Sequence, residues 1–185
     1  MSKTYKVAID IGHARRTGAR GNGYEEHEQC KKLAKELKSC FEGFKVGRYE
    51  ADIIDFEHLD NDGDLAATVK ALNNGGYDVS VSLHMDAAST PGPHGAHVCY
   101  TSKKGKALAH EIALRLCPQM PGRAERLVRR PGLYVLRKTR PVAVLVECGF
   151  ITNEWDAEWV DRNADKVARS IALGVAAWCD GWGGK

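Results

Sequence analysis

Short apolar runs of strand length alternate with helical patterns along most of this 185-residue chain. Each apolar run is bounded by glycine, proline or a polar residue, as the strands of a sheet usually are. The five runs cover residues 5–11, 78–83, 96–100, 133–136 and 142–146. The helical patterns occupy residues 25–41, 65–73, 104–116 and 162–178. Because parallel strands need crossover connections and bury both of their faces, we predict an α/β fold with a twisted, mostly parallel sheet and helices on both faces.

The size of the sheet and of the domain can also be predicted. A sixth strand is expected over residues 44–49, after the first helix, although Gly43 and Gly47 weaken its pattern. The expected sheet therefore has about six strands. No internal repeat, low-complexity tract or linker divides the sequence, and its length suits one hydrophobic core. We predict a single domain over residues 1–185.

The charge balance excludes some classes of partner. The formal net charge of +3 is mildly basic and falls short of the strong cationic stripe of a nucleic-acid binder. Basic residues gather between Arg123 and Arg140, and this segment is either a solvated loop or a substrate-facing patch. The N-terminal residues contain no apolar run of signal-peptide length, so we expect neither secretion nor membrane insertion. The protein is therefore expected in the cytoplasm.

Side chains capable of chemistry follow three of the apolar runs. His13 follows the first run, His84 follows the second, and Glu147 follows the last. Ligands of an open α/β sheet bind beyond the carboxyl ends of its strands, so these three groups are expected near one another. One histidine at a strand end is readily explained as a structural residue. Three chemical groups at three strand ends are much less expected by chance.

A carboxylate near the start of the first predicted helix would complete a metal site. Catalytic zinc typically takes three protein ligands, among which imidazole and carboxylate are common. Glu25, Glu26 and Glu28 follow a glycine-rich loop, TGARGNG, which could fold the helix start back over the strand ends. Acidic residues are also favoured in a first helical turn by the helix dipole, which is the ordinary explanation for at least two of the three. The residues alone leave the choice of ligand open.

Four segments of the chain resemble the zinc-dependent N-acetylmuramoyl-L-alanine amidases of bacterial wall remodelling and bacteriophage endolysins. They are, in order, IDIGH, GNGYEEHEQCKKLAKEL, YDVSVSLHMDA and VAVLVECGFITNEWD. The resemblance implies zinc ligands at His13, Glu26 and His84, and a catalytic carboxylate at Glu147. Glu26 is preferred because the family's ligand glutamate precedes a small helix residue by eight positions and a leucine by eleven, whereas a slip of one residue would choose Glu25.

Two features depart from the family pattern without removing a ligand. Asp86 stands where the family often has asparagine. Arg15 and Arg16 closely follow His13, where a glycine-rich stretch is common. These differences bear on substrate preference and on the loop beside the metal, where the two arginines could contact substrate carboxylates.

The resemblance also implies a function for the whole domain. The chain is expected to be an amidase catalytic domain that uses Zn²⁺ to hydrolyse the bond between N-acetylmuramic acid and L-alanine in bacterial peptidoglycan. A compact domain without a signal resembles an endolysin, which stays in the cytoplasm until a separately made membrane pore releases it to the cell wall. Peptidoglycan is the implied partner, nucleic acid is not, and the oligomeric state is left open.

Two other functions remain as alternatives. The metal ligands alone also permit another zinc hydrolase acting on peptides, which only the motif match disfavours. A catalytically silent wall-binding module is disfavoured because such proteins commonly lose a ligand or the glutamate, and here every position is filled. The remaining histidines are expected in surface or structural roles, and they are His27, His58, His94, His97 and His110. One of His94 and His97 could border the cleft.

Overall fold

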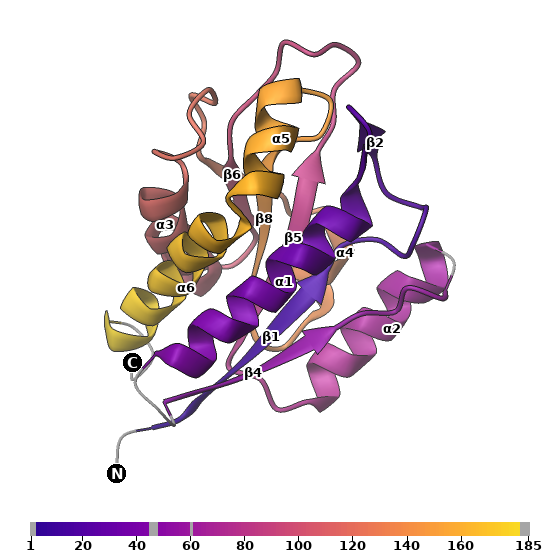
Figure 1. Ribbon diagram of the computed structural model, residues 1–185. Coiled ribbons are helices and arrows are strands. Elements are labelled where there is room, and N and C mark those ends of the chain that lie inside the picture. Colours follow the sequence, from indigo (N-terminus) through magenta and orange to yellow (C-terminus); the bar gives the residue numbers. More distant parts are fainter. Residues whose placement is uncertain (1–2, 45–47, 60, 182–185) are drawn as a thin grey trace.

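A six-stranded sheet forms the centre of the protein (Figure 1) in a computed structural model that describes residues 3–44, 48–59 and 61–181. The strand order is β4-β1-β5-β8-β6-β7. The strands span Tyr5–Ile11 (β1), Tyr49–Ile54 (β4), Val79–Asp86 (β5), His97–Tyr100 (β6), Leu127–Arg129 (β7) and Val142–Phe150 (β8). Among these strands, neighbours are parallel except β6 with β8. The predicted α/β fold, with a mostly parallel sheet of about six strands, is confirmed.

Helices cover both faces of the sheet (Figure 1). One face carries α1 (Glu26–Gly43), α3 (Lys103–Leu116), α5 (Glu154–Arg162) and α6 (Ala164–Gly181), and the other carries α2 (Asn61–Asn74) and α4 (Tyr134–Lys138). Successive strand residues point to opposite faces. Val7 and Ile9 of β1 therefore join the larger core, whereas Ala8 joins a smaller core with Leu72 of α2 and Val135 of α4. Among the helices of the described ranges, none combines the length and the hydropathy of a membrane span.

A short antiparallel ribbon leads from β1 into α1. Its strands, β2 (Arg20–Gly21) and β3 (Tyr24–Glu25), are formed by the glycine-rich loop and the residues after it. The side-chain amide of Asn22 donates a hydrogen bond of 2.9 Å to the carbonyl oxygen of Ile151, just beyond β8. This contact ties the ribbon to the carboxyl edge of the sheet, and α1 consequently begins close to the strand ends.

Helices α3 and α6 pack closely through Gly174. A Cβ atom at this position would lie 2.6 Å from the Cα atom of Ile112, a backbone atom that cannot rotate away. Gly174→Val is therefore expected to lower the free energy of unfolding by about 1–3 kcal/mol, the usual effect of overpacking a core. Urea unfolding followed by circular dichroism measures this change. Gly181→Val, at the end of α6 with nothing within 4 Å of the added atom, is the control, and equal losses in both variants would contradict the packing account.

One predicted strand is a helix. Residues 133–136 were predicted as a strand, but they lie at the start of α4, which packs Val135 and Leu136 into the smaller core. A run of four apolar residues is too short to distinguish a strand from a buried helical turn. The edge of the sheet is formed instead by β7, which the sequence pattern did not reveal.

Two further boundaries were wrong. The strand expected over residues 44–49 is β4, which begins at Tyr49, and residues 45–47 lie outside the described ranges. β4 is an edge strand with mixed exposure, so its hydrophobic pattern is weak. The helix expected over residues 162–178 corresponds to α6, and the separate helix α5 before it was missed.

Candidate metal and catalytic site

The predicted site residues lie together at the carboxyl edge of the sheet. His13 follows β1, His84 lies near the end of β5, and Glu147 lies near the end of β8. His84 and Glu147 are register partners on adjacent strands, so their side chains point to the same face of the sheet. Glu26, the first residue of α1, approaches them from the helix. The four residues thus come from four separate segments of the chain.

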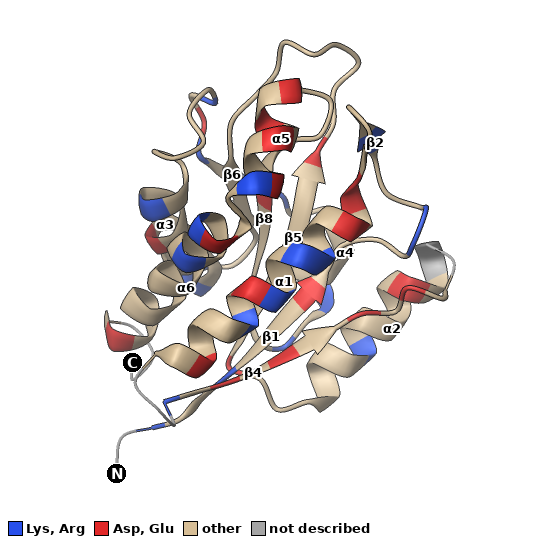
Figure 2. Ribbon diagram, in the orientation of Figure 1, with Lys and Arg blue, Asp and Glu red and all other residues tan. Residues whose placement is uncertain are grey.

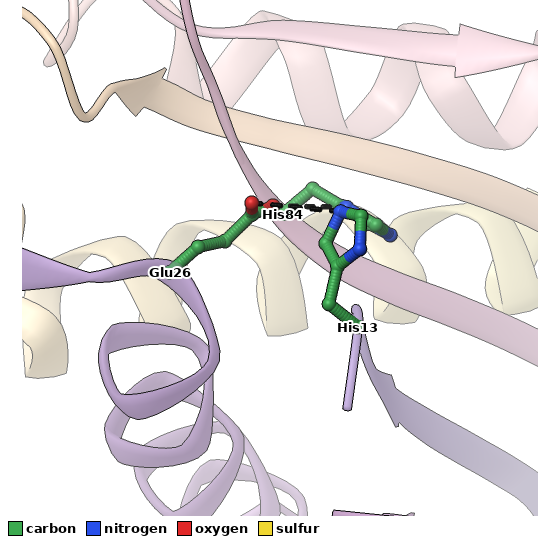
Figure 3. A group of neighbouring side chains, drawn as sticks. All are labelled: His13, Glu26 and His84. Carbon is green, nitrogen blue, oxygen red and sulfur yellow. Dashed lines mark hydrogen bonds and ion pairs between the residues drawn. The ribbon is translucent and has the colours of Figure 1, made fainter. Parts of the chain in front are cut away.

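His13, Glu26 and His84 form a compact cluster of potential metal ligands (Figure 3). Nδ1 of His84 lies 3.1 Å from Oε1 of Glu26, and Nε2 of His13 lies 3.5 Å from Oε2 of Glu26. The two imidazole rings meet edge to face, with their centroids 5.0 Å apart. One ligand atom from each residue lies within 4.8 Å of the other two. Three donors this close can converge on one cation.

The carboxylate of Glu26 is held in place by the backbone. Its Oε1 accepts a hydrogen bond of 3.0 Å from the backbone N–H of Met85, and its Oε2 accepts one of 2.8 Å from Ala19. The residue is only 2% exposed. Donors behind a carboxylate fix its orientation toward a metal. The cluster is therefore organised by the fold before any ligand arrives.

The loop after β1 is shaped to admit the histidines. A Cβ atom at Gly12 would lie 2.4 Å from the ring of His84, so only glycine lets the imidazole pack against this strand end. The next residue, His13, has a φ of 64°, in the left-handed region that non-glycine residues rarely adopt. Backbone strain of this kind concentrates at functional sites.

The members of the cluster shift one another's pKa. Burial alone would raise the pKa of Glu26, but the hydrogen bond with His84 and the charges of both histidines bring this pKa below its ordinary value. Burial alone would lower the pKa of His84, but Glu26 and Glu147 raise it to about 9. The surroundings therefore stabilise a positive charge beside Glu26, whether a proton on His84 or a cation.

Glu147 lies beside the ligand cluster without belonging to it. Burial raises the pKa of this carboxyl group to about 7, against the opposing charge of His84. Its Oε2 atom is buried and has no hydrogen-bond partner among the residues that the structure describes. A carboxyl group that titrates near neutral pH and keeps an unused acceptor atom suits a general base that later acts as an acid.

The structure distinguishes Glu26 from its acidic neighbours. Oε1 of Glu25 accepts a hydrogen bond of 2.6 Å from the backbone N–H of Arg16, and Oε2 pairs with Arg20 at 3.0 Å. The side chain of Glu28 is 56% exposed. Glu26 is thus the acid of this group that meets the two histidines, and its role as a metal ligand stays a prediction.

His27 belongs to a second polar cluster, which includes a lysine side chain. Its Nε2 lies 3.0 Å from Oδ1 of Asp55, and the two residues group with Glu57 as potential metal ligands. However, Nζ of Lys31 donates a hydrogen bond of 2.5 Å to Glu57 and lies 3.9 Å from Asp55. The lysine supplies positive charge to this group, and a structural role for His27 stays a prediction.

Three residues near Glu147 were not assigned to the site from the sequence, although His97 is one of the two histidines that could border the cleft. His97 is 1% exposed and is the register partner of Glu147 on β6, while burial lowers its pKa to about 4. Asp86 places Oδ2 3.8 Å from Nε2 of His97 and 3.7 Å from Nη1 of Arg123. The alternation of side chains along β6 would have predicted that His97 shares a face of the sheet with Glu147 only if the pairing of β6 with β8 had been known.

A cavity of about 120 Å³ adjoins His13 and His84 on the side of α2. The buried carboxylates of Asp10 and Asp64 line it. Asp10 accepts hydrogen bonds from Ser82 and Thr68, whereas Oδ1 of Asp64 has no partner in the described ranges. Burial and the charge of Asp10 raise the pKa of Asp64 to about 6. The surroundings of the histidines are therefore acidic on this side.

Comparison with known proteins relates most of the chain to one family. The family model described as N-acetylmuramoyl-L-alanine amidase matches residues 7–177. Among curated proteins, the N-acetylmuramoyl-L-alanine amidase LytC of Bacillus subtilis is 28% identical over 179 residues. This similarity covers 93% of the present chain and 35% of LytC, so the chain spans about a third of that relative.

Solved structures give the same relationship. The catalytic domain of the CD27L endolysin, described as targeting Clostridia difficile, is 26% identical with a TM-score of 0.81, covering 94% of this chain and 97% of that domain. An N-acetylmuramoyl-L-alanine amidase from Clostridium difficile 630 has a TM-score of 0.86 at 24% identity, covering 98% of this chain and 100% of that one. At this identity the second likeness shows the fold alone.

Proposed function

The chain belongs to the family of N-acetylmuramoyl-L-alanine amidases, and from this premise we propose that it is a zinc-dependent peptidoglycan hydrolase. Its reaction in this proposal is cleavage of the amide bond between N-acetylmuramic acid and L-alanine. The observation that carries the proposal is the convergence of His13, Glu26 and His84 beside the carboxyl group of Glu147. The amidase name of LytC agrees with it.

The donor set fits zinc. Two imidazoles and one carboxylate are a common ligand set of catalytic zinc. Ligand atoms about 2 Å from a tetrahedral zinc lie roughly 3.3 Å from one another. Oε1 of Glu26 lies 3.1 Å from His84 and Oε2 lies 3.5 Å from His13, so each oxygen approaches one histidine at about this separation. His13, Glu26 and His84 are therefore the residues that would hold the metal.

Glu147 is positioned to move the proton that hydrolysis requires. When bound at this site, zinc would act as a Lewis acid and make attack by water easier at neutral pH. The unused Oε2 of Glu147 accepts a proton from the attacking water as its oxygen bonds to the lactyl carbonyl carbon. Glu147 then returns the proton to the alanine nitrogen as the carbon–nitrogen bond breaks. The products are a glycan with a free lactyl carboxylate and a peptide with a free amine.

Replacing Glu26 should weaken zinc binding. Glu26→Gln is expected to lower zinc affinity by at least about 10- to 100-fold, since even partners behind a metal ligand contribute that much. Competition with a chromogenic chelator measures the affinity. Glu25→Gln removes the same charge one residue away and should keep an affinity near that of the unmodified protein. Equal losses in the two variants would count against Glu26 as the ligand.

The bond that is cleaved can be identified by mass spectrometry. Purified peptidoglycan digested by the protein should release peptides with a free N-terminal alanine and leave the glycan strands intact. Cleavage within the stem peptide would replace the amidase proposal by a peptidase acting at the same metal site. If peptidoglycans of several types all resist digestion, a wall-binding role without catalysis becomes the better account.

We further propose that the domain acts as an endolysin on the wall after release from the cytoplasm. Its likeness to the catalytic domain of the CD27L endolysin supports this setting. Export of the protein to the periplasm of a Gram-negative test strain should cause lysis, whereas cytoplasmic expression alone should not. The exported Glu147→Gln variant is the control. Lysis by both exported forms would contradict an enzymatic cause.

A further inference from the structure

The carboxyl edge of the sheet carries much negative charge. Figure 2 shows acidic positions at the carboxyl ends of β1 and β5 and in the first turn of α1. Glu147 and the cavity-lining Asp64 add to them. The stem peptide of peptidoglycan is itself anionic, because the glutamate that follows alanine is linked through its side chain and keeps a free α-carboxylate. Local positive charge besides that of the proposed zinc would favour the approach of this peptide to the edge.

Arg123 supplies positive charge at the carboxyl ends of β5 and β8. Its guanidinium lies over the ring of Phe150, 5.8 Å from the centroid, and its Nη1 lies 3.7 Å from Oδ2 of Asp86. The distance to Asp86 is longer than a hydrogen bond. The side chain is 27% exposed, so it is accessible to a ligand yet held by its neighbours.

The position of Arg123 along the strands matches the spacing of the substrate. Asp86 and Phe150 are register partners that follow the pair His84 and Glu147 on the same two strands, across an irregularity in the register. In a regular strand two residues advance about 6.6 Å, and the irregularity between His84 and Asp86 alters this advance locally. Two residues of extended peptide reach at most about 7 Å. A peptide whose alanine nitrogen is held at the reacting centre can thus bring the carboxylate of its second residue to Arg123.

We propose that Arg123 forms a subsite for the α-carboxylate of the glutamate in the stem peptide. The inference rests on the proposed amidase function and adds a substrate preference to it. Guanidinium and carboxylate form paired, charge-assisted hydrogen bonds, which a neutral carboxamide cannot reproduce. The enzyme should therefore distinguish glutamate from isoglutamine at this position.

Other cations near the site are less suited to this role. Arg15 and Arg16, which the sequence suggested for substrate carboxylates, are both exposed. Most of the basic segment between Arg123 and Arg140 is likewise exposed, including Arg126, Arg129 and Arg130. Arg123 combines partial burial with contacts to residues at the ends of β5 and β8. Within the basic segment, Arg123 is therefore the residue that we assign to the substrate carboxylate.

A comparison of two substrates tests the proposal. The zinc-loaded protein is given soluble muramyl peptides that differ only in having glutamate or isoglutamine after alanine, and kcat and KM are measured for each. The unmodified protein should show a kcat/KM about tenfold or more higher with glutamate. Arg123→Gln should cleave both substrates at the rate that the unmodified protein shows with isoglutamine. Arg123→Lys, which keeps the charge but loses the paired geometry, should retain part of the preference.

Controls separate recognition from folding and from the proposed reaction. Arg162→Gln removes the same charge from an exposed site on α5 and should keep the full preference. Zinc content and melting temperature should not change in Arg123→Gln. Equal kcat/KM values for the two substrates in the unmodified protein would overturn the subsite, as would an equal loss on both substrates in Arg123→Gln. Failure to cleave either substrate would instead overturn the proposed function and this inference with it.

Discussion

Glu147→Gln should lower kcat by a factor of about 100 to 10,000, the usual contribution of general acid–base catalysis, while zinc remains bound. Glutamine has nearly the shape of glutamate but cannot accept the proton of the attacking water. Glu147 lies outside the cluster formed by His13, Glu26 and His84, so the metal should stay in place. Release of alanine-terminated peptide measures turnover, and elemental analysis measures zinc per chain.

A matched substitution on the surface controls for the Glu147 result. Glu158→Gln changes a partly exposed glutamate on α5 that pairs with Arg162. It should leave both kcat and zinc content near their original values. If Glu147→Gln kept nearly full turnover, or lost zinc as completely as a ligand variant, the assigned role of Glu147 would be wrong.

His84→Ala should abolish zinc binding and turnover together. His84 lies between Glu26, at 3.1 Å, and its register partner Glu147. Its loss leaves one imidazole and one carboxylate, fewer than the three protein ligands typical of catalytic zinc. The pair of measurements therefore separates His84 from Glu147, whose replacement should affect turnover alone.

Two checks make the His84 result decisive. His110→Ala replaces a histidine whose side chain is 61% exposed and should keep zinc and activity. Removal of the His84 ring leaves space beside Gly12, so the folding of His84→Ala must be checked. Circular dichroism should show that the variant is folded. Retention of one tightly bound zinc per chain by the folded variant would contradict the proposed ligand set.

The sequence predicted an α/β fold with about six mostly parallel strands, which is confirmed, and it placed three candidate site residues at one edge of the sheet. His13, His84 and Glu147 each follow an apolar run, and the carboxyl ends of parallel strands meet at one edge. Hydrophobic pattern is a local property, so it revealed these strands well. The same reasoning failed for residues 133–136, where a short apolar run belongs to a helix, and for the edge strand β7.

The choice among neighbouring acids depended on information that is not local. Glu25 and Glu26 are adjacent and chemically identical, and resemblance to the family favoured the second. The structure explains the difference, because Glu25 is engaged by Arg16 and Arg20 while Glu26 turns toward the histidines. Arg123 was visible only as the first residue of a basic segment. Its place beside Asp86 follows from how the loop after α3 packs against β5 and β8, which no sequence pattern specifies.

The most direct test of the central claim is a zinc titration of the metal-stripped protein during digestion of purified peptidoglycan. The release of peptides with free N-terminal alanine is measured at each addition of zinc. The account predicts almost no release without metal, then a rise that levels off near one zinc per chain through His13, Glu26 and His84. Full release of alanine-terminated peptide by the stripped protein, unchanged by added zinc, would contradict the account.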